Sequence, residues 1–290
     1  MSEVHRVPFD GDAALYVEEY GKAHGGPRAA SRPRGDAVVF GHTLLTDGRI
    51  FIDQVTDLAQ DHHVLNVDLR GHGRSDAPRR AFTLVDTAVD YLRAMDACGV
   101  ARATLVGASM GAMAALRLAL SHPDRVAGLV LIGASASAER PTSRARLLAL
   151  GATARLLGPR PWLVRQASEL LFGPTFRAAH PEVVGRWEEQ LARLDPAGIA
   201  RAVAAGAQRP DLTARLFQIT APTLLLVGDE DRMTPPARSR TLAAALPHAR
   251  LELLPATGHL PSVERPRAVA GFIRHFLRAP SAVQSDRQQD

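Results

Sequence analysis

A serine lies at the centre of the pentapeptide Gly107-Ala108-Ser109-Met110-Gly111, which has the form Gly-x-Ser-x-Gly. An apolar run with β-branched residues precedes it at 104–106, and a stretch with helical apolar spacing follows it to about residue 120. A turn from strand to helix this short brings the two backbones together, so both glycine positions tolerate little else. Ser109 would then project at the helix N-terminus, where unpaired backbone N–H groups stabilise an oxyanion. The pattern predicts a nucleophilic serine, and a serine that only caps the helix is the alternative.

A serine hydroxyl becomes a useful nucleophile when a base takes its proton and an acid orients that base. Among the eleven histidines, His42, His72 and His259 follow predicted strands at the edge of a sheet where sites lie. His259, in a Thr-Gly-His turn after the last strand, is the candidate base, whereas the other two are interpreted as braces for their loops. The turn after the preceding strand, residues 228–231, offers Asp229, Glu230 and Asp231 as the acid.

Several strands must carry these residues to one edge. Continuous apolar runs predict strands at residues 38–40, 64–67, 104–106, 126–132, 222–227 and 250–254. Helical patterns separate the runs, and their alternation predicts an α/β fold with a mostly parallel, twisted sheet covered by helices on both faces. A β-hairpin at 4–20 and a loop at 21–36 come before the first of these strands.

The strand pattern stops between residues 136 and 217, where apolar residues recur at helical spacing and prolines separate the stretches. The sequence therefore predicts an all-helical cap at 136–217, inserted between core segments at 1–135 and 218–279. The polar tail at 280–290 is expected to be disordered.

A cap over the serine would exclude water and provide the walls of a substrate pocket. We expect its aromatic side chains to form those walls, namely Trp162, Phe172, Phe176 and Trp187, and burial between the cap helices is the alternative for Trp187. The loops below the cap are expected to complete the pocket through His42, Met233 and Leu260.

Composition excludes several classes of function. The single cysteine, Cys98, permits no internal disulfide, and it is interpreted as a small core residue. The first residues lack the apolar stretch of a signal peptide, and no run of about 18 apolar residues predicts a membrane span, so we expect a cytoplasmic protein. The net charge of +5 comes from scattered arginines, and only 5% of residues are aromatic, which argues against nucleic-acid binding.

Four motifs together resemble the α/β-hydrolase superfamily. The pentapeptide around Ser109 resembles its nucleophile elbow, and residues 68–75, Asp-Leu-Arg-Gly-His-Gly-Arg-Ser, resemble its D-x-R-G-H-G-x-S turn. Residues 228–231 resemble its acid turn, Gly-x-x-Asp, and Gly258-His259 resembles its histidine loop. The resemblance covers about 35–135 and 215–278. It implies an eight-stranded sheet and favours Asp231 over Asp229 as the acid of a Ser-His-Asp triad.

The same resemblance assigns an oxyanion hole. The family's His-Gly segment corresponds to His42-Thr43, which places the two donors at the backbone N–H groups of Leu44 and Met110. Thr43 stands where the family usually has glycine, so the backbone at this position can differ from that of the family.

Ser109 does not fit the branches that use an aspartate nucleophile, the epoxide hydrolases and haloalkane dehalogenases. Short matches at residues 43–47, 109–111 and 234–236 are most similar to the 3-oxoadipate enol-lactonase branch. The sequence therefore predicts a serine hydrolase of a small or medium carboxylic ester or lactone that needs no metal and no organic cofactor. A ligand receptor or signalling module on the same fold, with little turnover, is the alternative.

Overall fold

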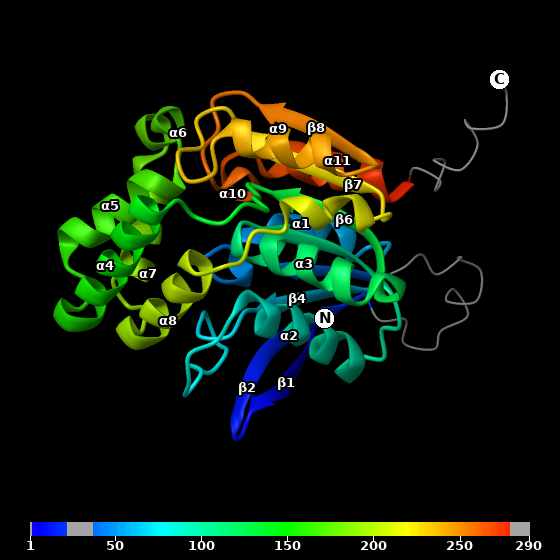
Figure 1. The fold of residues 1–290 in the computed structure, drawn as a ribbon, viewed down its shortest axis with the longest axis horizontal. Helices are drawn as coiled ribbons and strands as arrows, with labels where there is room; N and C mark the ends of the chain where they lie inside the picture. The colour runs from blue at the N-terminus through cyan, green and yellow to red at the C-terminus, as the bar shows by residue number, and fades with distance from the viewer. Residues whose placement is uncertain (1, 22–36, 279–290) are drawn as a thin grey trace, which may run out of the picture.

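The computed structural model describes residues 2–21 and 37–278, so most of the predicted loop at 21–36 and the predicted tail at 280–290 lie outside the described residues. An eight-stranded sheet forms the centre of the molecule, with the strand order β1-β2-β4-β3-β5-β6-β7-β8 (Figure 1). The strands are β1 (Glu3–Asp10), β2 (Ala13–Tyr20), β3 (Ala37–Gly41), β4 (Val64–Asp68), β5 (Ala103–Ala108), β6 (Val126–Ile132), β7 (Thr223–Gly228) and β8 (Ala249–Leu254).

The sheet is parallel from β4 to β8, whereas β1 and β2 pair antiparallel with each other and β2 pairs antiparallel with β4. The predicted hairpin and mostly parallel sheet are confirmed. The strand that follows β3 in sequence, β4, lies on one side of β3, and β5 and the later strands lie on the other side. Such a reversal of strand order between β3 and β5 places a crevice beyond the carboxyl ends of these strands. Gly41, the last residue of β3, pairs with Gly107 of β5, so the loops that follow these two strands start side by side.

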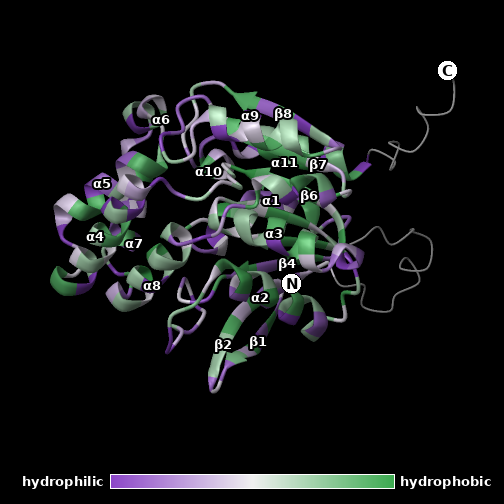
Figure 2. Ribbon diagram, viewed as in Figure 1, coloured by the Kyte–Doolittle hydropathy of each residue, from purple (hydrophilic) through white to green (hydrophobic). Residues whose placement is uncertain are grey.

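Helices cover both faces of the sheet because the side chains of each strand alternate between two cores. In β5, for example, Leu105 belongs to one apolar cluster and Val106 to the other. One face is covered by α2 (Leu84–Ala97), α3 (Met110–Ser121) and α9 (Pro236–Ala245), and the other by α1 (Ile52–Leu58) and α11 (Pro266–Arg278). Figure 2 shows the central strands in the hydrophobic colour, while the helices are mixed.

Between β6 and β7 the described chain forms helices and no strand. This helical insertion (residues 136–217) lies together at one end of the sheet, to the left in Figure 1. Its α-helices are α4 (Pro141–Leu157), α5 (Pro161–Leu171), α6 (Pro174–Ala179), α7 (Pro181–Leu191) and α8 (Pro196–Ala207). Each begins with proline, whose fixed φ suits the first helical position and whose missing N–H would have had no partner there.

Two short helices were not expected from the sequence: α6 and α10 (Pro261–Glu264). Each contains fewer than two turns, so neither can show a repeating apolar spacing. No helix in the described part of the chain is both long and apolar enough to cross a membrane.

Candidate active site

The serine at the centre of the Gly-x-Ser-x-Gly pattern lies between the end of β5 and the start of α3. Ser109 has φ 47° and ψ −103°, a conformation that L-residues rarely adopt and that the surrounding structure must enforce. A Cβ on Gly107 would lie 2.4 Å from the backbone nitrogen of Ala112, and one on Gly111 would lie 2.1 Å from the carbonyl oxygen of Gly41. Glycine is therefore required at both positions, for the reason that the sequence predicted.

The histidine and the acid follow the last two strands at the same edge. Nδ1 of His259 lies 2.8 Å from Oδ2 of Asp231, and both side chains are almost fully buried. The N–H groups of Met233 and Thr234 donate to Oδ1 of Asp231, each at 2.9 Å, and the hydroxyl of Thr234 lies 2.8 Å from Oδ2. This arrangement holds the imidazole with Nδ1 toward the acid and leaves Nε2 as the nitrogen that can act as a base.

The charge state of Asp231 follows from two opposing effects. Burial on its own raises the pKa of this carboxyl, but the neighbouring His259 and the hydrogen bonds from His259 and Thr234 together lower the pKa below its usual value. Asp231 is therefore a carboxylate near neutral pH, and a carboxylate is an acceptor only. Nδ1 of His259 must then carry the proton that the two groups share in their hydrogen bond.

A common neighbour brings the serine and the histidine toward each other. The N–H of Ser109 donates to the carbonyl oxygen of Ile132 at 2.8 Å, which fixes the serine against the end of β6. A Cβ on the next residue, Gly133, would lie 3.1 Å from two ring atoms of His259, so the imidazole covers that glycine. Ser109 and His259 thus each contact one of the two consecutive residues 132 and 133.

The other two acids of the turn have different contacts. Asp229 accepts a hydrogen bond from the N–H of Thr257 at 3.3 Å, and Glu230 accepts from the N–H of Thr175 at 3.0 Å and also from its hydroxyl. Asp229 therefore binds the histidine loop at Thr257, and Glu230 binds the start of α6 at Thr175. Of the three acids, Asp231 is the one hydrogen-bonded to His259.

His42 braces the loop after β3. Its Nε2 accepts a hydrogen bond from the N–H of Leu69 at 2.8 Å, so Nδ1 carries the proton and donates to the carbonyl oxygen of Thr43, also at 2.8 Å. Burial lowers the pKa of His42, and burial together with His42 lowers the pKa of the neighbouring His72 to about 3. Both rings are neutral near pH 7, which fits the predicted bracing role.

The same loop reaches the start of α3. The N–H of Gly111 donates to the carbonyl oxygen of His42 at 3.1 Å. Met110 is the first residue of α3, so its N–H has no partner inside the helix, and among the described residues no backbone oxygen accepts from the N–H of Leu44. The hydroxyl of Thr43 lies 3.5 Å from Nε2 of His259, which places the residue that replaces the family's glycine beside the base nitrogen.

Sequence reasoning missed Glu264, which binds the N–H groups of the two residues next to His259. Its buried carboxylate accepts from the N–H of Gly258 at 2.8 Å and of Leu260 at 3.3 Å, and also from the N–H of Gly173 in the helical insertion at 3.3 Å. Burial raises the pKa of Glu264. A glutamate in the first turn of a helix that follows a loop can reach back to free amides, and this spacing was the available signal.

The sequence model of a family described as "alpha/beta hydrolase fold" matches residues 36–266 of this chain. The chain belongs to the α/β-hydrolase family. The hydrolase is 32% identical over 254 residues to a protein from Variovorax paradoxus (strain S110) that is named as a carbamate hydrolase, RutD, with 86% of this chain and 94% of that protein covered.

Two solved structures resemble the hydrolase closely in fold. A thermophilic esterase from Thermogutta terrifontis, with malate bound, gives a TM-score of 0.85 at 28% identity and covers 96% of this chain and 98% of its own. The enol-lactonase from Burkholderia xenovorans LB400 gives a TM-score of 0.84 at 27% identity, with 94% and 100% covered. Both cover the helical insertion as well as the core, since so little of the chain is left out.

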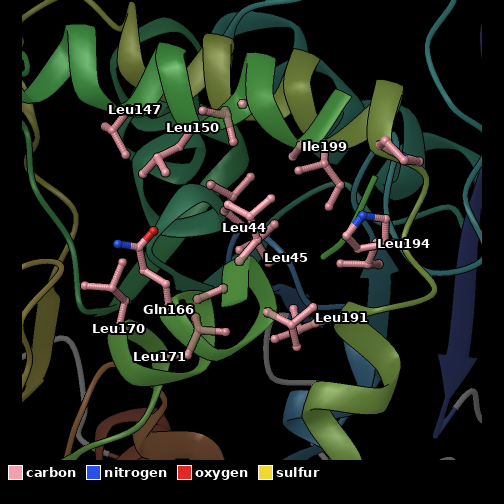
Figure 3. Close-up of a pocket in the computed structure, with 18 of the residues that line it drawn as sticks. Leu44, Leu45, Leu147, Leu150, Gln166, Leu170, Leu171, Leu191, Leu194 and Ile199 are labelled. Atoms are coloured by element: carbon pink, nitrogen blue, oxygen red, sulfur yellow. The ribbon is translucent and has the colours of Figure 1, made fainter. Parts of the chain in front are cut away.

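The hydrolase has an apolar cavity between the helical insertion and the loops after β3 and β7 (Figure 3). Met233 lines it, as expected, whereas His42 and Leu260 do not. The expected aromatic wall is absent from this cavity, whose lining includes none of Trp162, Phe172, Phe176 and Trp187.

The four aromatic side chains lie elsewhere in the insertion. Trp162 is 54% exposed, and Trp187 is buried in the apolar cluster that joins the insertion to the face of the sheet covered by α1 and α11. Phe172 and Phe176 stack on each other with ring centroids 5.6 Å apart. Helical spacing correctly indicated apolar faces, but it did not indicate which of those faces meets the cavity.

Proposed function

We propose that this hydrolase cleaves a carboxylic ester or lactone through an acyl-enzyme intermediate, with Ser109 as the nucleophile. The observation that carries the proposal is the buried Asp231–His259 pair at the sheet edge where the strained Ser109 turn also lies. A neutral imidazole held by a carboxylate is the group that activates a serine hydroxyl. Relatives named as an esterase and an enol-lactonase share the fold.

Each residue has a defined step. Nε2 of His259 takes the proton of the Ser109 hydroxyl as its oxygen attacks the substrate carbonyl, and Asp231 stabilises the imidazolium that forms. The N–H groups of Leu44 and Met110 bind the oxyanion of the tetrahedral intermediate. His259 then protonates the leaving alcohol. Water, deprotonated by the same imidazole, attacks the acyl-enzyme and releases the acid, so Ser109 regains its proton.

The helical insertion acts as a cap in this proposal. The peptide N–H of His259 donates to the carbonyl oxygen of Leu171 at 3.0 Å, so the end of α5 lies directly against the histidine loop. A cap in that position limits the access of water to the acyl-enzyme and presents its own side chains to the substrate. It supplies no proton-transfer group, because the reacting groups all come from the loops after the strands.

The proposal is tested with Ser109→Ala, and Ser121→Ala at the other end of α3 is the matched control. We expect Ser109→Ala to lose labelling by a fluorophosphonate and to lower kcat for p-nitrophenyl acetate by about 10⁴–10⁶. Ser121→Ala should retain both. Labelling that persists in Ser109→Ala contradicts the assignment, and labelling without turnover in the native chain favours a ligand receptor instead.

A further inference from the structure

The apolar cavity has a volume of about 130 Å³ and adjoins the loops that carry the proposed machinery. Aliphatic side chains from α4, α5, α7 and α8 form most of its lining. Gln166 is the only residue of the lining whose side chain has nitrogen or oxygen atoms, and no lining residue is charged. Figure 3 shows Leu44 and Leu45 in the middle, between Leu147 and Leu150 on one side and Leu171 on the other.

Two lining residues connect the cavity to the reacting groups. Leu44 contributes its side chain to the cavity and its N–H to the proposed oxyanion hole. Met233 contributes its side chain to the cavity and its N–H to Asp231. A substrate whose carbonyl oxygen binds the N–H of Leu44 therefore lies next to the cavity, because the side chain of the same residue lines it.

We propose that this cavity binds an uncharged acyl chain, so that the enzyme prefers medium-chain esters or lactones over small polar ones. This rests on the proposed function, because it assumes that Ser109 carries the acyl group. The acyl chain stays attached to Ser109 after the alcohol has left, and an apolar cavity suits the part of the substrate that remains.

The lining of the cavity determines which groups can be attached to the acyl chain. A carboxylate at the far end of the acyl group would enter an apolar space with no cation to pair with, and an unpaired buried charge is strongly unfavourable. A group as small and polar as a carbamate would leave the cavity unfilled. The substrates of this hydrolase should therefore differ from those of enzymes that bind acyl groups with a terminal carboxylate.

The volume of the cavity limits the length of the acyl chain. An apolar cavity of about 150 Å³ in another protein binds benzene, so the cavity here holds about six carbons. Each methylene that leaves water for such a site improves binding about fourfold. We therefore expect kcat/KM for p-nitrophenyl esters to rise from acetate to about the hexanoate and to stop rising beyond that length.

The test fills the cavity from α4. Ala154 lines the cavity, whereas Ala152, two residues earlier on the same helix, is exposed and outside the lining. We expect Ala154→Leu to move the optimum about two to three carbons shorter and to lower kcat/KM for the octanoate at least tenfold. The loss should grow with the length of the acyl chain, so kcat/KM for the acetate should fall less than kcat/KM for the octanoate. Ala152→Leu, with the same substitution on the same helix, should leave the profile unchanged.

A second pair of substrates tests the charge of the lining. Mono-p-nitrophenyl adipate has the same carbon chain as p-nitrophenyl hexanoate but ends in a carboxylate. We expect its kcat/KM to be at least about 100-fold lower in the native chain. Equal rates for the two esters overturn the proposal. So does an identical chain-length profile in Ala154→Leu and Ala152→Leu, or a profile that responds to the alcohol in a series of alkyl acetates instead of to the acyl chain.

A binding measurement separates this inference from the proposed function. Hexanamide is an unreactive analogue of the acyl chain, and its Kd can be measured by calorimetry in Ser109→Ala, which cannot turn over. We expect Ala154→Leu in that background to weaken binding at least tenfold and Ala152→Leu to leave it unchanged. Cavity-dependent binding without ester hydrolysis by the native chain rejects the proposed function alone, whereas Ser109-dependent hydrolysis without cavity-dependent binding rejects the acyl-chain proposal alone.

Discussion

The loops at the carboxyl ends of the strands and the helical insertion are held in place by different kinds of contact. At the loops, hydrogen bonds hold backbone N–H groups and buried polar side chains, as in the contacts of Asp231 and His42. In the insertion, aliphatic and aromatic faces pack against each other, as around Trp187 and Leu191. Hydrogen bonds specify direction and distance, whereas apolar packing accepts any side chain of suitable volume. The contrast suits a fixed reaction chemistry and an adjustable substrate pocket.

The largest expected effect that sharpens this contrast is at Asp231. Asp231→Asn removes the carboxylate that fixes the tautomer of His259, so kcat should fall by up to about 10⁴ while the fold persists. Asp229→Asn, two residues earlier, should cost far less, because the carboxylate of Asp229 accepts a hydrogen bond from the N–H of Thr257 instead of from the imidazole. The measurement is kcat for p-nitrophenyl acetate in both variants. Equal and small losses would mean that the acid is not Asp231.

Substitutions in the insertion should act on stability more than on chemistry. Trp187 is 9% exposed and Trp162 is 54% exposed, and neither lines the cavity. We expect Trp187→Ala to lower the free energy of unfolding by about 3 kcal/mol and Trp162→Ala to change it by less than about 0.5 kcal/mol. Denaturant titration measures both. A changed acyl-chain preference in Trp162→Ala would show that this side chain reaches the substrate after all.

The last prediction concerns the pH dependence of unfolding, through the buried, neutral His72. Its pKa is about 3 in the folded chain and about 6.5 in an unfolded one. Between these values the unfolded state binds more protons, so the free energy of unfolding falls as the pH decreases, by up to about 1.4 kcal/mol per pH unit for this group.

His72→Gln should make the pH dependence of unfolding shallower between pH 6.5 and 3. His122→Gln, at an exposed histidine after α3, is the control and should leave the slope unchanged. Denaturant titrations at several pH values measure the slope in each variant. Equal slopes in the native chain and in His72→Gln would show that His72 is protonated in the folded state.

The parallel strands, and the edge of the sheet at which the loops after them meet, were predictable because a buried parallel strand is apolar along its whole length. Such runs place Ser109, Asp231 and His259 directly after strand ends, and parallel strands bring those ends to one edge. The choice between Asp229 and Asp231 needed a known family, since both follow β7 within three residues. Only the conformation of the turn decides which carboxylate faces the histidine.

The arrangement of the insertion was not predictable in the same way. A helical period shows that Phe172 or Trp187 faces some apolar partner, but the partner depends on how five helices pack, which no local pattern encodes. Glu264 was missed for a related reason. Its three acceptor contacts join residues 173, 258 and 260, and the first of these is distant in the sequence and comes near only in the folded chain.

The contacts of Glu264 have a consequence for how the enzyme can diverge. On the insertion side, the histidine loop is held through the carbonyl oxygen of Leu171 and the N–H of Gly173, which are backbone atoms. These two contacts use no side chain of α4, α7 or α8, so they can persist when those side chains change. Gly173 itself must remain glycine, because a Cβ there would lie 2.8 Å from the backbone nitrogen of Gly258. New specificities can therefore be engineered, or evolve, by exchanging these helices while the 171–173 junction and Glu264 are retained.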